Sequence, residues 1–206
     1  LSALGVLKTP KEDGADIVTG DCQSLGIPMS YGGPGAGYMA TTKAYIRKLP
    51  GRIVGMSKDV DGKRAYVLTL QAREQHIRRE KANSNICSNQ SLMALYVTIY
   101  LSLMGPEGLK EVNELSYQGA HYLYDRLIAT GKFQPAFQKP FLKEFCLKTN
   151  LPVETIQEVL LKNGIFGAVP MEEYGEEYHN MVSFAVTEKR TQEEIDRLVS
   201  LLEVVA

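Results

Sequence analysis

Beyond Gly131, the hydrophobic positions switch between helix-like and strand-like spacing. The segment 152–163 carries apolar residues on one side of a predicted helix, and Gly164 follows it as the residue that ends the helix. Thr191 and Glu194 form a capping box, which marks the start of a closing helix. In chain order, the sequence predicts a strand at 141–148, a helix at 152–163, a strand at 181–186 and a helix after Thr191. This order predicts a small α+β domain at 132–206.

Two long helices are predicted before this domain. The first is capped by Asn85 or Ser88 and runs to about Met104. Gly105 and Pro106 end it, because proline disrupts an α-helix interior. The second helix has apolar residues at helical spacing, and we expect it to connect two domains. The predicted division is therefore a larger domain at 1–104 and a connecting helix at 105–131.

Residues 1–104 contain shorter patterns. Four runs are typical of strands, and the first of them is predicted to be buried: 15–19, 38–41, 51–55 and 65–70. Asp61 and Gly62 predict a hairpin turn between the last two runs. Thr42 is placed to cap a short helix. A loop rich in glycine and proline fills 20–37.

Composition limits the class of protein. The chain is 44% hydrophobic and 23% charged, with a formal net charge of −1. This is typical of a globular protein and argues against a nucleic-acid partner, for which a basic excess is expected. The most apolar run, 91–104, is too short to span a membrane. Because the chain starts at Leu1 without a recognisable domain start, we expect it to be a fragment.

The three cysteines, Cys22, Cys87 and Cys146, have neither metal-type spacing nor a disulfide framework. Their number is odd and they are scattered along the chain. Together with the lack of a visible signal peptide, this predicts a reducing cytoplasm.

The segment 35–40 matches G-x-G-x-x-A, but it is not expected to bind a dinucleotide. That fingerprint needs a strand before the glycines and a helix opening at them. Here a proline-containing loop precedes the glycines and a strand follows them, so we interpret the glycines as structural residues of a tight loop.

The densest charge lies between Arg73 and Lys81, where nine residues include four Arg or Lys, two Glu and His76. Glu74 and Arg78 can pair on a solvated helix face, and composition alone favours that interpretation. The polar run 83–85 follows at a predicted helix N-terminus. Backbone N–H groups there can bind an anion, so a site for phosphate or carboxylate stays open.

The segment from Arg73 to Cys87 reads R-E-Q-H-I-R-R-E-K-A-N-S-N-I-C. It closely resembles the signature of glycine dehydrogenase (decarboxylating), the P-protein family of the glycine cleavage system, in its N-terminal-half or subunit 1 form. Further segments agree with the same family: 26–28, 32–34, 49–55, 105–109 and 187–191. A natural subunit of this kind is about twice as long, so this chain resembles its C-terminal half.

The resemblance implies an α/β fold, namely part of the large domain of a fold-type I transferase that uses pyridoxal phosphate (PLP), followed by the small α+β domain. It also implies a reaction in which glycine loses CO2 and its aminomethyl group passes to the lipoyl arm of the H-protein. PLP accepts the electrons that decarboxylation leaves behind.

One position departs from this chemistry. The family's PLP-binding lysine lies shortly before an Ile-Pro pair and a glycine run, and the comparable position here holds Gln23, before Ile27 and Pro28. An amide cannot form an imine with an aldehyde. We therefore expect no catalytic residue in this chain and PLP held covalently by a partner, the lysine-bearing subunit 2.

The resemblance gives the charged stretch a role. Asn83 and Ser84 are expected to reach the phosphate of the partner's PLP, and the interface or channel mouth would be lined by Arg73, His76, Arg78 and Arg79. These residues could instead only stabilise the fold or the interface.

Two other functions stay open. The chain could be a self-sufficient PLP enzyme that uses Lys43, the first lysine after the glycine loop, or an assembly module that binds only proteins.

Overall fold

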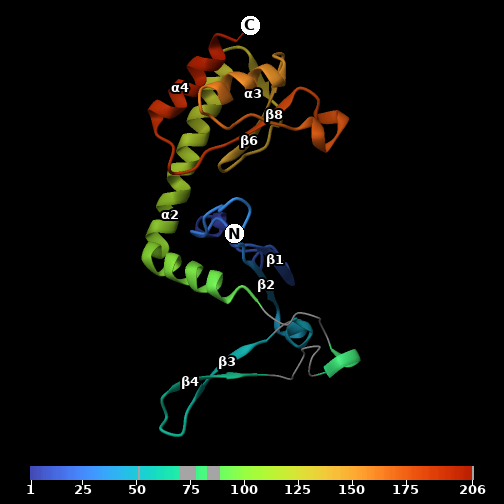
Figure 1. Cartoon of the computed structure of the whole chain (residues 1–206), viewed down its shortest axis with the longest axis vertical. Helices are drawn as coiled ribbons and strands as arrows, with labels where there is room; N and C mark the ends of the chain where they lie inside the picture. The colour runs from blue at the N-terminus through green and yellow to red at the C-terminus, as the bar shows by residue number, and fades with distance from the viewer. Residues whose placement is uncertain (51, 70–77, 83–88, 206) are drawn as a thin grey trace. The chain divides into compact units, whose positions relative to one another are not determined.

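The structure is a computed structural model that describes residues 1–50, 52–69, 78–82 and 89–205. The chain divides into two compact units. Unit 1 comprises Leu1 and Leu7–Leu103, and unit 2 comprises Ser2–Val6 and Met104–Ala206 (Figure 1). The division of the sequence into 1–104, 105–131 and 132–206 remains a prediction.

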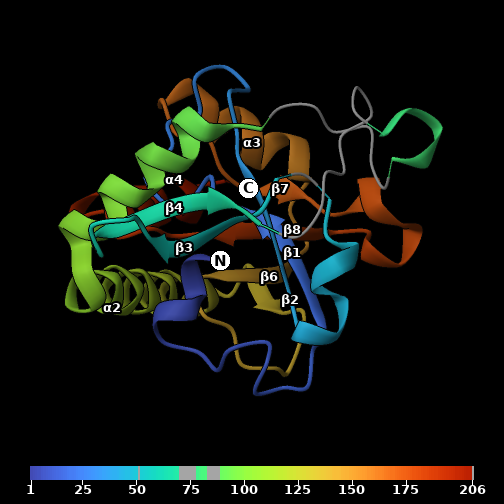
Figure 2. The ribbon, with the colours of Figure 1, turned by 90° about the horizontal axis from the view of Figure 1, so that it is seen from below.

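Unit 1 contains two antiparallel ribbons (Figure 2). The first pairs β1 (Ile17–Asp21) with β2 (Gly37–Thr41), and the second pairs β3 (Val54–Lys58) with β4 (Arg64–Leu68). The predicted strands therefore form, with ends that differ from the predicted ones by at most three residues. Every strand pair among the described residues is antiparallel.

The prediction of a buried first strand is wrong for the described structure. Only Val18 of β1 is partly buried, and the other four residues are exposed. A two-stranded ribbon covers neither of its faces by itself, so a β-branched sequence does not ensure burial.

The predicted hairpin turn is present between β3 and β4. Asp59 Oδ1 accepts hydrogen bonds from the backbone N–H groups of Asp61 and Lys63, both at 2.9 Å. Gly62 has a φ of 77°, which glycine adopts without a steric cost.

Short 3-10 helices complete unit 1. They are η2 (Lys43–Lys48) and η3 (Arg79–Lys81). Thr42 precedes η2 in an extended conformation, but its side chain makes no capping hydrogen bond. The predicted cap is therefore wrong in its chemistry, although the helix follows at the predicted place.

The helix α2 (Ser91–Ala129) comprises the two predicted helices, which follow one another across a kink. Gly105 is non-helical, with φ 61° and ψ −176°, and Pro106 follows it. The predicted interruption is therefore confirmed as a kink, at a position where proline occupies the first turn of a new helical segment. The predicted N-caps, Asn85 and Ser88, lie outside the described residues.

By length and composition alone, α2 could cross a membrane, and 6% of its most apolar window is buried. The kink at Gly105 leaves a first straight segment, 91–104, of roughly 20 Å at 1.5 Å per residue. A bilayer core is about 30 Å thick, so this segment falls short of a span.

Unit 2 contains a four-stranded antiparallel sheet in the order β5-β6-β8-β7. The strands are β5 (Phe133–Pro135), β6 (Glu144–Thr149), β7 (Val169–Pro170) and β8 (Met181–Ala185). The helices are α3 (Val153–Lys162), α4 (Gln192–Glu203) and the short η1 (Ser2–Gly5), η4 (Glu172–Tyr174) and η5 (Glu176–Tyr178). The predicted elements are present, and β5 and β7 are additional.

The core of unit 2 lies between this sheet and the helices. In the β6–β8 register, Phe145 pairs with Phe184 and Leu147 with Val182, which places all four on one face. They form one buried cluster with apolar residues of α2, α3 and α4: Ala120, Leu123, Leu127, Ile156, Leu160, Ile195, Val199 and Leu202. Cys146 points to the other face, where burial raises the pKa of its thiol.

Local hydrogen bonds fix the helix ends as predicted. The Thr191 side chain accepts from the Glu194 backbone, and the Glu194 side chain accepts from the Thr191 backbone, which confirms the capping box. Gly164 follows the end of α3 with a φ of 73°, and Ile165 N–H donates to Leu160 O at 2.9 Å.

Candidate functional site

The loop between β1 and β2 carries Gln23, the position where the resemblance expects a lysine. Its two ends are joined by a hydrogen bond from Cys22 N–H to Ala36 O, at 2.8 Å. Asp21 closes the first turn, because its Oδ1 accepts from Gln23 N–H at 2.6 Å. The loop is therefore a closed structure that leaves and rejoins the ribbon at neighbouring positions.

Gln23 acts as a clamp across the first half of the loop. Its side-chain Nε2 donates to Ile27 O at 3.0 Å and to Pro28 O at 2.9 Å. Both hydrogens of the amide are thereby used, and the side chain is half-buried. Gln23 is thus a hydrogen-bonding residue of its own loop and not a group directed at a substrate.

The base of the loop is anchored in unit 1 by apolar contacts. Leu25, Ile27 and Ala36 are each at most 7% exposed. Gly26 has a φ of 84°, and a Cβ there would lie 2.6 Å from Cδ2 of Tyr100 on α2. Only glycine allows the ring of Tyr100 to pack this closely against the loop.

The tip of the loop has the opposite character. Met29 is 82% exposed and Tyr31 is fully exposed. Ser30 and Tyr31 have φ values of 42° and 56°, in the left-handed region that side chains disfavour by on the order of 1–3 kcal/mol each. Met29 O accepts from the N–H groups of Gly32 and Gly33, so the tip is a defined turn. It combines an unfavourable backbone with an unburied aromatic ring.

Those of the other predicted site residues that the structure describes are Lys43, Arg78 and Arg79, and none of them shares the hydrogen bonds of Gln23. Lys43 begins η2 with an exposed side chain. Arg78 and Arg79 are exposed, and Arg79 has a positive φ of 52°. Four further candidates lie outside the described residues: Arg73, His76, Asn83 and Ser84.

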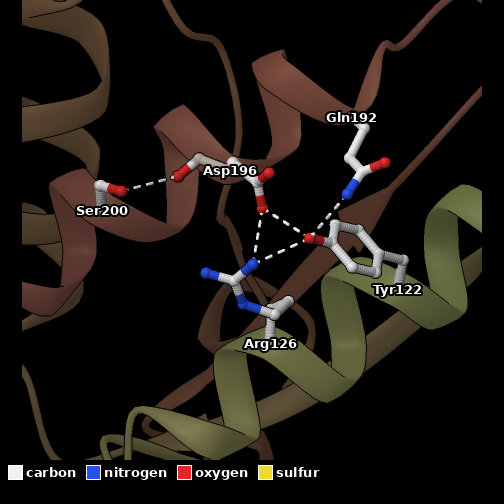
Figure 3. A network of polar contacts seen from close by, with 5 residues as sticks. All are labelled: Tyr122, Arg126, Gln192, Asp196 and Ser200. Carbon is white, nitrogen blue, oxygen red and sulfur yellow. Dashed lines mark hydrogen bonds and ion pairs between the residues drawn. The ribbon is translucent and has the colours of Figure 1, made fainter.

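A polar network in unit 2 was not predicted from the sequence (Figure 3). Asp196 Oδ1 on α4 accepts from Tyr122 Oη and from Arg126 Nη1 on α2, both at 2.7 Å. Arg126 Nη1 also donates to Tyr122 Oη at 2.8 Å, and Gln192 Nε2 donates to the same oxygen at 3.2 Å. The spacing of Tyr122 and Arg126 by four residues is visible in the sequence, but the acceptor lies 70 residues further on. The network joins two helices and has the character of a structural clamp.

Unit 2 also contains a recess of about 460 Å³ beside β8 and α4. Its walls are mostly apolar, with Phe166 and Phe184 among them. Two of its polar residues, Arg190 and Glu194, pair with each other at 3.3 Å. Among the residues that the structure describes, no group of three or more His, Cys, Asp or Glu is placed to hold a metal ion.

Comparison with known proteins identifies the family. The family described as the glycine cleavage system P-protein matches residues 1–202. This chain belongs to the glycine cleavage system P-protein family. One relative, the probable glycine dehydrogenase (decarboxylating) subunit 1 of Desulforamulus reducens, is 54% identical over 97% of this chain and 45% of its own length.

Solved structures support the P-protein assignment. A crystal structure of glycine decarboxylase (P-protein) in inhibitor-bound form is 46% identical, with a TM-score of 0.90 over 100% of this chain and 46% of that one. A C-DES variant with glycine covalently linked to its PLP cofactor has a TM-score of 0.55 at 14% identity and shows a shared fold. The predicted fold class, part of a PLP-dependent fold-type I protein, is confirmed. The chain spans less than half the length of the P-protein relatives that it matches.

Neither of the two positions considered for covalently bound PLP in this P-protein chain fits that role. The expected lysine position holds Gln23, whose amide nitrogen is committed to two backbone carbonyls. Lys43 is exposed on η2, whereas lysines that form imines are commonly desolvated.

Proposed function

We propose that this chain is part of subunit 1 of a two-subunit glycine dehydrogenase (decarboxylating). It supports the PLP-dependent decarboxylation of glycine and the transfer of the aminomethyl group to the lipoyl arm of the H-protein. The lysine that holds PLP belongs to the partner, subunit 2. The family membership and the relatives named subunit 1 support the two-subunit arrangement.

The observation that carries this proposal is the state of Gln23. A loop that retained a cofactor role would keep a nucleophilic nitrogen free at this position. Here the nitrogen is an amide, and both of its hydrogens are donated to Ile27 O and Pro28 O. The position therefore offers a structural hydrogen-bond donor and no nucleophile, which supports the proposal that PLP is held by another chain.

The test is a glycine–bicarbonate exchange assay on the full-length protein, on the lysine-bearing subunit and on their mixture. Exchange is expected only in the mixture, and borohydride is expected to fix PLP on the lysine-bearing subunit alone. A yellow full-length protein whose colour is fixed at Lys43 would instead show a self-sufficient PLP enzyme. Equal exchange by the lysine-bearing subunit with and without this protein would leave only an assembly role.

A finer part of the proposal concerns the charged stretch. Asn83 and Ser84 contact the phosphate of the PLP held by the partner, and Arg73, His76, Arg78 and Arg79 line the interface or the channel mouth. The exposed side chains of Arg78 and Arg79 are compatible with such a lining. Arginine suits this position because its planar guanidinium binds carboxylate and phosphate through paired hydrogen bonds.

Replacing both Asn83 and Ser84 by alanine should weaken PLP retention in the two-subunit complex. Hydrogen bonds to a charged group are worth about 1.5–3 kcal/mol, so the PLP dissociation constant should rise roughly tenfold or more. Equilibrium dialysis against PLP measures this constant, with Asn89→Ala, an exposed amide beside the stretch, as the matched control. Unchanged PLP affinity in the double variant would contradict the cross-subunit contact.

The cytoplasm is the compartment we propose. Cys22 and Cys146 are free thiols among the described residues, in agreement with a reducing environment.

A further inference from the structure

We draw no further inference here: the strongest candidate, the mostly apolar recess of about 460 Å³ beside β8 and α4 in unit 2, carries nothing, because nothing in the structure shows what covers it.

Discussion

Asp196 shows how much a single residue can contribute through its position. Its Oδ1 is the shared acceptor of Tyr122 and Arg126, so one carboxylate oxygen links α4 to two successive turns of α2. Gln192 adds a donor from the first turn of α4 (Figure 3). Shared acceptors of this kind couple several side chains, so the loss of one carboxylate disturbs more than one hydrogen bond.

Replacing Asp196 by alanine should therefore destabilise the protein by about 1 kcal/mol. A charge-assisted pair would contribute more if buried, but both side chains are 39% exposed and solvent screens them. Urea unfolding measures the change. Glu158→Ala is the control, since its ion pair with Lys162 spans 3.6 Å at 70% and 76% exposure and should cost less than about 0.5 kcal/mol. Equal losses in the two variants would show that the network adds nothing to an ordinary surface pair.

For Gln23, the sequence predicts the residue's chemistry but not its hydrogen-bond partners. The absence of a lysine at this position follows from the residue type alone. The two carbonyls that its amide binds depend on how the loop folds back on itself, through Gly26 and the ring of Tyr100. Tyr100 lies 77 residues after Gln23 in the sequence, so no local sequence pattern predicts that the loop packs against it.

At the scale of elements, the sequence predicted best where local signals were strong. The capping box at Thr191, the hairpin turn at Gly62 and the kink at Gly105 are all present, because each depends on residues only a few positions apart. The strands β5 and β7 were missed, since they have three and two residues and acquire their strand character only by pairing with β6 and β8. Burial of β1 was predicted wrongly, because burial depends on what covers a strand.

The whole chain presents more apolar surface in unit 1 than its own fold covers. The first segment of α2 is apolar on several sides, but only the side of Val97 is buried. The opposite side exposes a stripe at helical spacing: Leu92, Leu95, Ile99 and Leu103. The ribbon of β3 and β4 exposes further apolar side chains: Val54, Met56, Tyr66 and Leu68. A helix with apolar residues on both sides is typical of an interior, which agrees with a chain that spans 45% of a relative's length.

The isolated 206-residue chain should consequently associate with itself. Water-exposed apolar stripes of this size favour association, at roughly 25 cal/mol for each Å² that becomes buried. Light scattering after size exclusion should give a mass that rises with concentration from the 22.9 kDa of one chain.

Charged substitutions locate the surface responsible. Leu92→Glu combined with Ile99→Glu should return the chain toward a single copy, because two carboxylates on the stripe would have to be desolvated for it to pack. Leu161→Glu, at a residue of unit 2 that is 67% exposed, is the control and should leave the association unchanged. If the original chain is a single copy at every concentration, or if Leu161→Glu disperses it equally, the α2 stripe is not the surface through which the chain packs against other polypeptide.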